Sequence, residues 1–397
     1  MSIAAKVASQ MQAQSWIRQM FEVGLALKAQ HGARNVFDLS LGNPILEPPA
    51  AFYARLRQIL DAPPPGGHRY MPNAGYPETR AAVAAQLAKD TGRPFAGSDV
   101  VMTIGAAGGL NVVFKSILDP GDEVVVLAPF FPEYLFYIDN HNGVPVIAET
   151  DDGFLPDAAA LEAKLTARTK AVLLNSPNNP TGVVYPSAVL NAVGEVLARA
   201  EARFGHTIYL VSDEPYAKLL YDDASYPYVY QHHPASIGVV SYSKDLSLAG
   251  ERIGYVAVNT DCPDKGPLMD ALIFSNRVLG FVNAPALMQR AVEALQGVAV
   301  DTDWYKARRD RLYQGLFALG FDVVKPGGAF YLFPKSPIPN DVDFVQSLLG
   351  LQVLVVPGTG FGRPGYFRMS YSVENWVIDG ALERISAASA TLGLAPA

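Results

Sequence analysis

Between about residues 100 and 258, short apolar runs alternate with longer segments that have the pattern of amphipathic helices. The runs are rich in Val, Ile and Leu and nearly continuous, which is typical of strands buried on both faces of a sheet. Strands are expected at Val100–Thr103, Glu123–Leu127, Val144–Ala148, Ala171–Leu174, Ile208–Ser212, Ile237–Ser241 and Gly254–Val258. Helices are expected at Gly108–Leu118 and at Ser187–Arg203, which follows Pro186. The alternation predicts an open, mostly parallel α/β sheet of seven strands covered by helices.

After about Asn283 the pattern changes to a long helical stretch followed by shorter apolar runs and Pro-Gly turns. Strands are expected here at Phe321–Val324, Ala329–Phe333, Leu351–Val356 and Tyr366–Tyr371. This pattern predicts a smaller α/β domain, joined by the N-terminal segment. We therefore expect a large domain over residues 45–285 and a small domain over residues 1–44 and 286–397.

Composition restricts the classes of protein to consider. The 397 residues are 50% hydrophobic and 17% charged, as in compact soluble proteins. A formal net charge of -7 without a basic run argues against a general nucleic-acid binder. The single cysteine, Cys262, excludes an intramolecular disulfide, and no Cys/His cluster has metal-site spacing. The N-terminus does not read as a secretory signal and no apolar run approaches the roughly 20 residues of a membrane span, so we expect a cytoplasmic protein.

The run Ser241-Tyr-Ser-Lys-Asp follows an apolar run and precedes Arg252 by a few residues. A lysine on the surface is usually only solvated, but this one has hydroxyls beside it and a guanidinium downstream. Lys244 can condense with an aldehyde, while Ser241, Ser243 and Arg252 can hold a phosphate through charge-assisted hydrogen bonds. The motif therefore suits a cofactor that carries both groups.

Two loops place polar groups at the carboxyl ends of predicted strands, where ligands bind in open α/β sheets. The loop Gly105-Ala-Ala-Gly-Gly109 opens a helix, so its backbone N–H groups could receive a phosphate, although such turns are also common without a ligand. The loop Asn175-Ser-Pro-Asn-Asn-Pro-Thr-Gly182 has the composition of a simple turn. Its distinctive sequence favours a rigid loop that aims the amide of Asn179 at a ligand.

Asp213 stands at the end of a predicted strand, and Tyr216 follows it three residues later. An acid in such a place is most often solvated or caps a helix. A buried Asp213 would instead pair with a pyridinium N–H, and Tyr216 would share the phenolic oxygen of that ring with Asn179.

Arg368 and Phe131 each leave two interpretations open. Arg368 lies inside an apolar strand and needs an anionic partner there, either in a structural salt bridge or as a clamp on a substrate carboxylate. Phe131 is either a core aromatic residue, the commoner case, or a ring that stacks on an aromatic cofactor.

Together these segments resemble the class I aminotransferases, pyridoxal-phosphate (PLP) enzymes of fold type I, over nearly the whole chain. The resemblance rests on Leu41-Gly-Asn-Pro44, Tyr70-x4-Gly75, Asn179-Pro-Thr-Gly182, Asp213-x2-Tyr216, Ser241-x-Ser-Lys244 with Arg252, and Arg368. It implies a homodimer with shared active sites that transfers the α-amino group of an L-amino acid to a 2-oxo acid by a ping-pong mechanism, with PLP as cofactor.

The resemblance also implies a role for each residue. Lys244 would form the covalent link to the cofactor aldehyde and later move the proton, and Asp213 would bind the pyridine nitrogen. Asn179 and Tyr216 would hydrogen-bond the ring oxygen, and Phe131 would stack on the ring. The phosphate would be bound by Ser241, Ser243, Arg252 and the backbone at Gly105, Ala106 and Ala107, with Tyr70 reaching it across the dimer interface. The substrate α-carboxylate would be bound by Gly42, Asn179 and Arg368.

Two positions depart from the family pattern. Ala107 stands where many relatives have a hydroxyl, which leaves only a backbone contact to the phosphate. Arg277 lies near the place where aspartate-specific members carry an arginine for the distal carboxylate, but the neighbouring Phe281–Pro285 differs, so dicarboxylate specificity is in doubt.

Two other functions fit a related scaffold. The same cofactor-binding motifs occur in lyases and decarboxylases, and they do not decide which substrate bond breaks. A PLP-sensing regulator domain would need an N-terminal helix-turn-helix module. The family-like segment begins by about Asp38, and the chain is acidic, so this alternative is not favoured.

Overall fold

The computed structural model describes residues 3–12, 16–389, 392 and 394. At its centre is a seven-stranded sheet with the order β2-β8-β7-β6-β5-β3-β4. The strands are β2 (Val100–Thr103), β3 (Glu123–Ala128), β4 (Val144–Glu149), β5 (Thr169–Asn175), β6 (Tyr209–Asp213), β7 (Ser236–Ser241) and β8 (Gly254–Val258). Only β8 runs antiparallel to its neighbours in this sheet. The mostly parallel α/β sheet predicted from the sequence is therefore confirmed.

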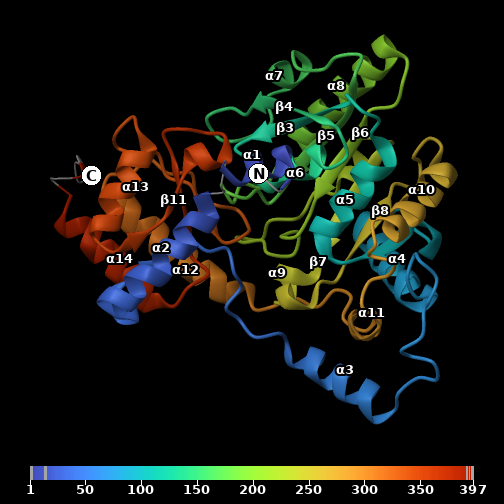
Figure 1. The fold of residues 1–397 in the computed structure, drawn as a ribbon, viewed down its shortest axis with the longest axis horizontal. Coiled ribbons are helices and arrows are strands. Elements are labelled where there is room, and N and C mark those ends of the chain that lie inside the picture. The colour runs from blue at the N-terminus through green and yellow to red at the C-terminus, as the bar shows by residue number, and fades with distance from the viewer. Residues whose placement is uncertain (1–2, 13–15, 390–391, 393, 395–397) are drawn as a thin grey trace.

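Helices cover both faces of this sheet (Figure 1). The helices in this part of the chain are α3 (Ala50–Asp61), α4 (Pro77–Thr91), α5 (Gly105–Ile117), α6 (Glu133–Asp139), α7 (Ala158–Glu162), α8 (Ser187–Phe204), α9 (Tyr242–Asp245) and α10 (Lys265–Val278). Alternate strand residues point to opposite faces. Val124 and Val126 pack with α5 and α10, whereas Val125 and Leu127 belong to the core that includes α8.

Two details of this part differ from the sequence-based expectation. β4 is not buried on both faces, because it forms the edge of the sheet and leaves Val144 exposed. α5 begins at Gly105 rather than at Gly108, so the glycine-rich segment is the first turn of the helix itself.

The remaining elements pack beside the large sheet. They are the helices α1 (Ala5–Gln12), α2 (Trp16–His31), α11 (Ala286–Glu293), α12 (Thr302–Ala318), α13 (Asp341–Gly350) and α14 (Asn375–Ala387), and the strands β1 (Phe37–Asp38), β9 (Tyr331–Leu332), β10 (Val353–Leu354), β11 (Val356–Pro357) and β12 (Phe367–Ser370). β1 pairs in parallel with β10, and β11, β12 and β9 form an antiparallel sheet. The N-terminal segment thus joins the C-terminal part, while the domain limits at residues 45 and 285 stay a prediction.

The expected strand at Phe321–Val324 is wrong. These residues follow α12 as irregular chain and pair with no strand. Phe321 is buried, and Val323 and Val324 pack against the core. The apolar residues of this run are there because their side chains pack in the core, and the run does not pair as a strand.

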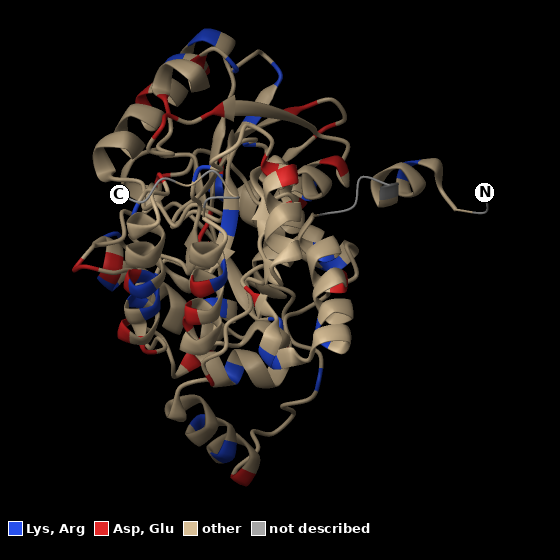
Figure 2. Ribbon diagram, turned by 90° about the vertical axis from the view of Figure 1, so that its left-hand side faces the viewer, with Lys and Arg blue, Asp and Glu red and all other residues tan. Residues whose placement is uncertain are grey.

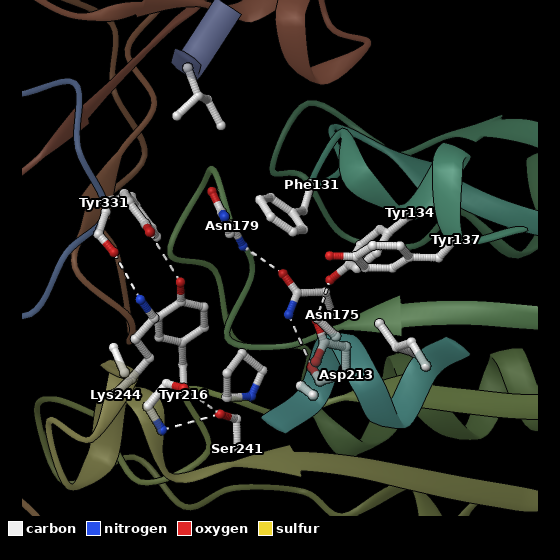
Figure 3. Close-up of a pocket in the computed structure, with 18 of the residues that line it drawn as sticks. Phe131, Tyr134, Tyr137, Asn175, Asn179, Asp213, Tyr216, Ser241, Lys244 and Tyr331 are labelled. Carbon is white, nitrogen blue, oxygen red and sulfur yellow. Dashed lines mark hydrogen bonds between the residues drawn. The ribbon is translucent and has the colours of Figure 1, made fainter. Parts of the chain in front are cut away.

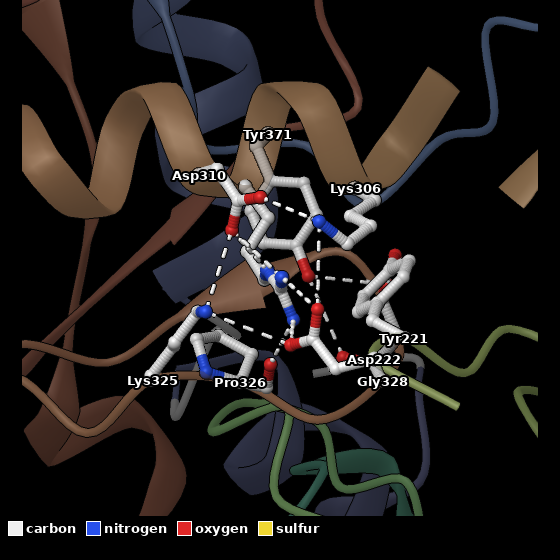
Figure 4. Close-up of polar contacts among 10 residues, drawn as sticks. Tyr221, Asp222, Lys306, Asp310, Lys325, Pro326, Gly328 and Tyr371 are labelled. Carbon is white, nitrogen blue, oxygen red and sulfur yellow. Dashed lines mark hydrogen bonds and ion pairs between the residues drawn. The ribbon is translucent and has the colours of Figure 1, made fainter. Parts of the chain in front are cut away.

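A polar network joins the loop after Leu220 to α12 (Figure 4). Arg309 of α12 is fully buried, and its guanidinium contacts Asp222 at 2.8 Å and Asp310 at 2.7 Å. Lys306 lies 3.0 Å from Asp310 and 3.4 Å from Asp222. The buried cation is paired with both carboxylates, so this network connects the loop after Leu220 firmly to α12.

Some elements project from the body of the molecule. α3 extends away from the main body on connecting segments (Figure 1), and α1 also projects from it in the second view (Figure 2). Tyr53 and Leu60 of α3 are exposed, and so is Tyr70 in the segment after it. Figure 2 shows basic and acidic residues interspersed over the body of the molecule. No helix within the described residues is long and apolar enough to span a membrane.

Candidate active site

A cavity of about 300 Å³ lies at the carboxyl ends of β5, β6 and β7 (Figure 3). Asn175, Asp213 and Ser241 are the last residues of these three strands and all line it. The predicted site residues that line the cavity are Gly42, Ala106, Ala107, Phe131, Asn179, Asp213, Tyr216, Ser241, Ser243, Lys244, Arg252 and Arg368. Parallel strands bring these separate motifs to one edge of the sheet.

Lys244 projects into the cavity from the short helix α9, directly after β7. Its Nζ donates a hydrogen bond of 2.8 Å to the carbonyl oxygen of Gly42. Burial, with the positive charges of Arg368 and Arg252 nearby, lowers the pKa of Lys244 from 10.5 to about 8. A larger fraction of this amine is therefore unprotonated near neutral pH than of an ordinary lysine.

Asp213 is buried at the end of β6 with one carboxylate oxygen bound and the other free. The hydroxyl of Tyr134 donates to Oδ2 at 2.5 Å, whereas Oδ1 has no hydrogen-bond partner among the described residues. Burial raises the pKa of Asp213 from 3.8 to about 7, and the hydrogen bond from Tyr134 opposes this rise. A buried acid with an unpartnered oxygen is suited to pair with a cationic N–H of a ligand.

Arg368 enters the cavity from β12 and is almost fully buried. Its Nη1 donates to Oδ1 of Asn179 at 2.9 Å, and its Nη2 donates to the carbonyl oxygen of Ser40 at 2.6 Å. Its Nε has no hydrogen-bond partner, and no salt bridge to it occurs within the described part of the chain. A structural salt bridge is therefore not what holds this cation.

Asn179 is held in place by its own loop. Its backbone N–H donates to Oδ1 of Asn175 at 2.7 Å, and Nδ2 of Asn175 donates to the carbonyl oxygen of Asp213 at 3.0 Å. The loop thereby connects the end of β5 to the end of β6, which orients the amide of Asn179 and the carboxylate of Asp213 together.

Two tyrosines meet across the cavity. The hydroxyls of Tyr216 and Tyr331 lie 3.0 Å apart, and both residues are buried. A Cβ at Gly42 would collide with the hydroxyl of Tyr331. Glycine is needed at position 42 because the backbone passes directly beside this ring.

Polar groups from three elements form a cradle for an anion. Ser241 and Ser243 place their Oγ atoms 2.6 Å apart at the end of β7. Ala106 and Ala107 lie in the first turn of α5, where free backbone N–H groups and the helix dipole favour a negative charge. Arg252, which adopts a positive φ of 52°, adds a guanidinium to the same wall.

Three predicted or considered residues do not line the cavity. Gly105 is not among the lining residues; it adopts a positive φ of 78°, which favours glycine, and a Cβ there would come within 3.0 Å of Nη2 of Arg252. Tyr70 is 92% exposed and lies outside the cavity of this chain. Arg277 is exposed on α10, where its guanidinium lies 5.4 Å from the ring of Phe274.

Several residues of the wall were not expected from the sequence: Ile17, Leu110, Tyr134, Tyr137, Asn175, Pro215, Ala249 and Tyr331. Tyr134 stands three residues after Phe131, one helical turn, and the two rings pack edge to face with centroids 5.5 Å apart. That spacing could have indicated Tyr134. Nothing in the sequence near Tyr331 indicates its contact with Tyr216.

Comparison with known proteins agrees with this geometry. Residues 34–385 match the family model described as aminotransferase class I and II. The probable aspartate/prephenate aminotransferase of Thermus aquaticus is 35% identical over 91% of this chain and 94% of its own length. The crystal structure of an aminotransferase from Eubacterium rectale has a TM-score of 0.95 at 35% identity and covers 98% of each chain. The aspartate aminotransferase of Thermus thermophilus with maleate has a TM-score of 0.85 at 31% identity, covering 98% of this chain and 100% of that one.

The fold and the cavity therefore define an α/β enzyme of the aminotransferase type. The chain belongs to the class I and II aminotransferase family, whose members use PLP, and the resemblance inferred from its motifs is confirmed.

Proposed function

We propose that this aminotransferase binds PLP through Lys244 and Asp213 and transfers the α-amino group of an L-amino acid to a 2-oxo acid in two half-reactions. The observation that carries the proposal is the shared cavity. It holds a lysine with a lowered pKa, an acid with a free oxygen and an unpaired arginine together. Each of these groups suits a different part of the cofactor or of the substrate.

The residues present fit PLP. The free Oδ1 of Asp213 would accept the N–H of a protonated pyridine ring, and the cradle of Ser241, Ser243 and Arg252 would hold the phosphate. Phe131 lines the same cavity and would pack on the ring, while Asn179 and Tyr216 would hydrogen-bond its phenolic oxygen. When bound, PLP supplies an aldehyde for an amine to attack and a ring that accepts electrons from the substrate carbon.

Lys244 would perform the proton transfers. As a free amine it removes a proton from the substrate Cα, and as an ammonium it returns a proton later in the same half-reaction. A pKa of about 8 leaves both forms accessible near neutral pH. Meanwhile Asp213, held by Tyr134, would keep the ring nitrogen protonated.

Arg368 would bind the α-carboxylate of the substrate. Within the described residues it is a buried cation without an ion pair, and such a group is costly unless an anion joins it. Asn179 already holds Nη1 of Arg368, which leaves the guanidinium oriented for a carboxylate.

Replacing Arg368 by lysine should weaken amino-acid binding. Lysine keeps the charge but loses the planar pair of donors, so we expect the kcat/KM for the donor to fall by about 10²-fold, mainly through KM. Steady-state kinetics and the half-reaction with donor alone measure this change.

Arg309 is the matched control, because it is as deeply buried but already ion-paired with Asp222 and Asp310. Arg309→Lys should lower the thermal unfolding midpoint and leave KM unchanged. If Arg368→Lys also lowered only the unfolding midpoint, the clamp would be ruled out.

The preferred donor is tested by a half-reaction. Each amino acid is added without an oxo acid to the PLP-loaded chain, and the loss of the aldehyde absorbance is recorded. The cations that line the cavity are Lys244, Arg252 and Arg368, each of which has a proposed role. The described residues of one chain therefore supply no further lining cation for a distal carboxylate. The Thermus aquaticus relative is named for aspartate and prephenate, so aspartate and an aromatic amino acid are the first donors to compare. A transaminase converts its cofactor with a donor alone, and a failure with every donor would contradict the proposal.

We further propose a homodimer in which Tyr70 reaches the phosphate in the other copy. The support is that Tyr70 is exposed, lies outside its own cavity, and follows the projecting α3 with its exposed Tyr53 and Leu60. Sedimentation equilibrium measures the oligomeric state.

A further inference from the structure

A second buried acid follows Asp213 directly in the sequence. Asp213 faces the large cavity, whereas Glu214 lines a separate cavity of about 20 Å³, just enough for one water molecule. Pro215 lines both cavities. The carboxyl groups of Asp213 and Glu214 therefore face different cavities at the end of β6.

The carboxyl group of Glu214 has no cationic partner within the described part of the chain, although the hydroxyls of Ser212 and Tyr226 are in its neighbourhood. The residue is 1% exposed, and neither carboxyl oxygen has a hydrogen-bond partner among the described residues. The cation that lines the small cavity is Lys218, but its Nζ lies 3.1 Å from Oδ2 of Asp245 and is already paired there. An ionised Glu214 would thus be a buried charge without a cation to pair with it.

The other titratable groups around Glu214 do not supply a positive charge. Tyr226, Tyr228, Tyr230 and Tyr255 come from the segment before β7 and from β8, and Glu214 contributes to the raised pKa of each of these tyrosines. Further along the same cavity the titratable groups are Asp90 of α4 and Tyr242 and Asp245 of α9. All of these groups are neutral or negative at neutral pH.

We propose that Glu214 is the protonated member of a pair of buried acids, so that Asp213 alone carries the negative charge that faces the cofactor ring. The negative charge assigned to Asp213 rests on the proposed function. The proton assigned to Glu214 is inferred independently, from the small cavity and its lining residues. Glu214 is a positioning residue in this arrangement, because it touches neither cofactor nor substrate. Its neutrality prevents a second charge from altering the ion pair between Asp213 and the ring nitrogen.

The pKa of Glu214 agrees with this arrangement. Burial raises it from 4.5 to about 8; the hydroxyls of Ser212 and Tyr226 oppose the rise, and the charge of Asp213 adds to it. A folded chain would keep this proton up to about pH 8, while an unfolded chain loses it near pH 4.5. Between these values each pH unit shifts the folding equilibrium up to tenfold toward the unfolded chain.

The variant Glu214→Gln tests whether Glu214 is protonated, because glutamine has the shape of the neutral acid but cannot ionise. Relative to this variant, the wild type should lose stability steadily from pH 5 to pH 8, by up to about 10³-fold in the unfolding equilibrium constant, and no further above pH 8. Urea unfolding of the full-length, PLP-loaded chains at several pH values measures the difference.

Glu123→Gln is the matched control. Glu123 is also a buried glutamate on the sheet, but Arg168 lies 2.6 Å from it. Burial opposes its ionisation, yet hydrogen bonds from Thr166 and Arg168 prevail and lower the pKa of Glu123. The stability that Glu123→Gln loses should therefore stay constant between pH 5 and pH 8, in contrast to the growing difference at Glu214.

The infrared spectrum gives a second readout. At pH 7 the difference spectrum between the wild type and Glu214→Gln should contain the carbonyl band of a protonated carboxylic acid, because the subtraction removes any band from Asp213, whose pKa is also raised. A stability difference that is flat with pH, or a band that is absent from the wild type, would overturn the proposal. A wild type that shows this difference band against Glu214→Gln but takes up no PLP would contradict the proposed function and still support a protonated Glu214.

Discussion

Replacement of Lys244 by alanine is expected to abolish turnover and the covalent attachment of PLP. Among the described residues, Lys244 is the lysine that lines the cavity, together with Asp213. Loss of both the nucleophile and the proton carrier should reduce kcat by at least on the order of 10⁴-fold. Borohydride reduction of the PLP-loaded chain, followed by peptide mapping, should place the label at position 244 in the wild type and nowhere in the variant.

Lys115→Ala is a suitable control, because Lys115 is exposed on α5 and does not line the cavity. This variant should keep its activity and its label at position 244. A Lys244→Ala chain that remained yellow and active would remove Lys244 from its role.

The rate of attachment should also depend on pH in a defined direction. Only the free amine attacks an aldehyde, and the pKa of Lys244 is lowered to about 8. Addition of PLP to a cofactor-free chain should therefore become faster as the pH rises toward about 8 and level off above it. An ordinary lysine would continue to gain reactivity until about pH 10.

The parts of the site that could be predicted from the sequence are those held together by short spacings. Ser241, Ser243 and Lys244 occur within four residues, and Tyr216 follows Asp213 by three residues. Each group follows an apolar strand, and parallel strands end at the same edge, so the motifs could be expected to meet there. The fold class followed from the same alternation of strands and helices.

The parts that could not be predicted depend on contacts between distant segments. Tyr331 and Tyr216 are 115 residues apart in the sequence, and only the folded chain brings their hydroxyls together. The need for glycine at position 42 appears only once the ring of Tyr331 is in place. Phe321–Val324 has the composition of a strand, but it finds no strand to pair with, and an apolar run alone cannot show that.

Replacement of Asp213 by asparagine is expected to have the second largest effect on catalysis. Asparagine keeps the shape but cannot hold a positive charge on the ring nitrogen, so kcat should fall by on the order of 10²–10³-fold while PLP remains attached. The free Oδ1 in a buried site is the structural reason, because a fixed charge is worth more there than in water. Stopped-flow measurement of the half-reaction separates this loss from any change in donor binding.

Tyr134→Phe provides a graded comparison for the same carboxylate. Removing its hydroxyl deletes the hydrogen bond of 2.5 Å to Oδ2, which favours the ionised form of Asp213. The pKa of Asp213 should therefore rise, the acidic limb of the pH–rate profile should move to higher pH, and kcat should fall by about tenfold, less than in Asp213→Asn. Near-normal turnover in Asp213→Asn would show that Asp213 does not bind the ring. An unchanged acidic limb in Tyr134→Phe would show that Tyr134 only fills space, because packing alone does not alter the protonation of its neighbour.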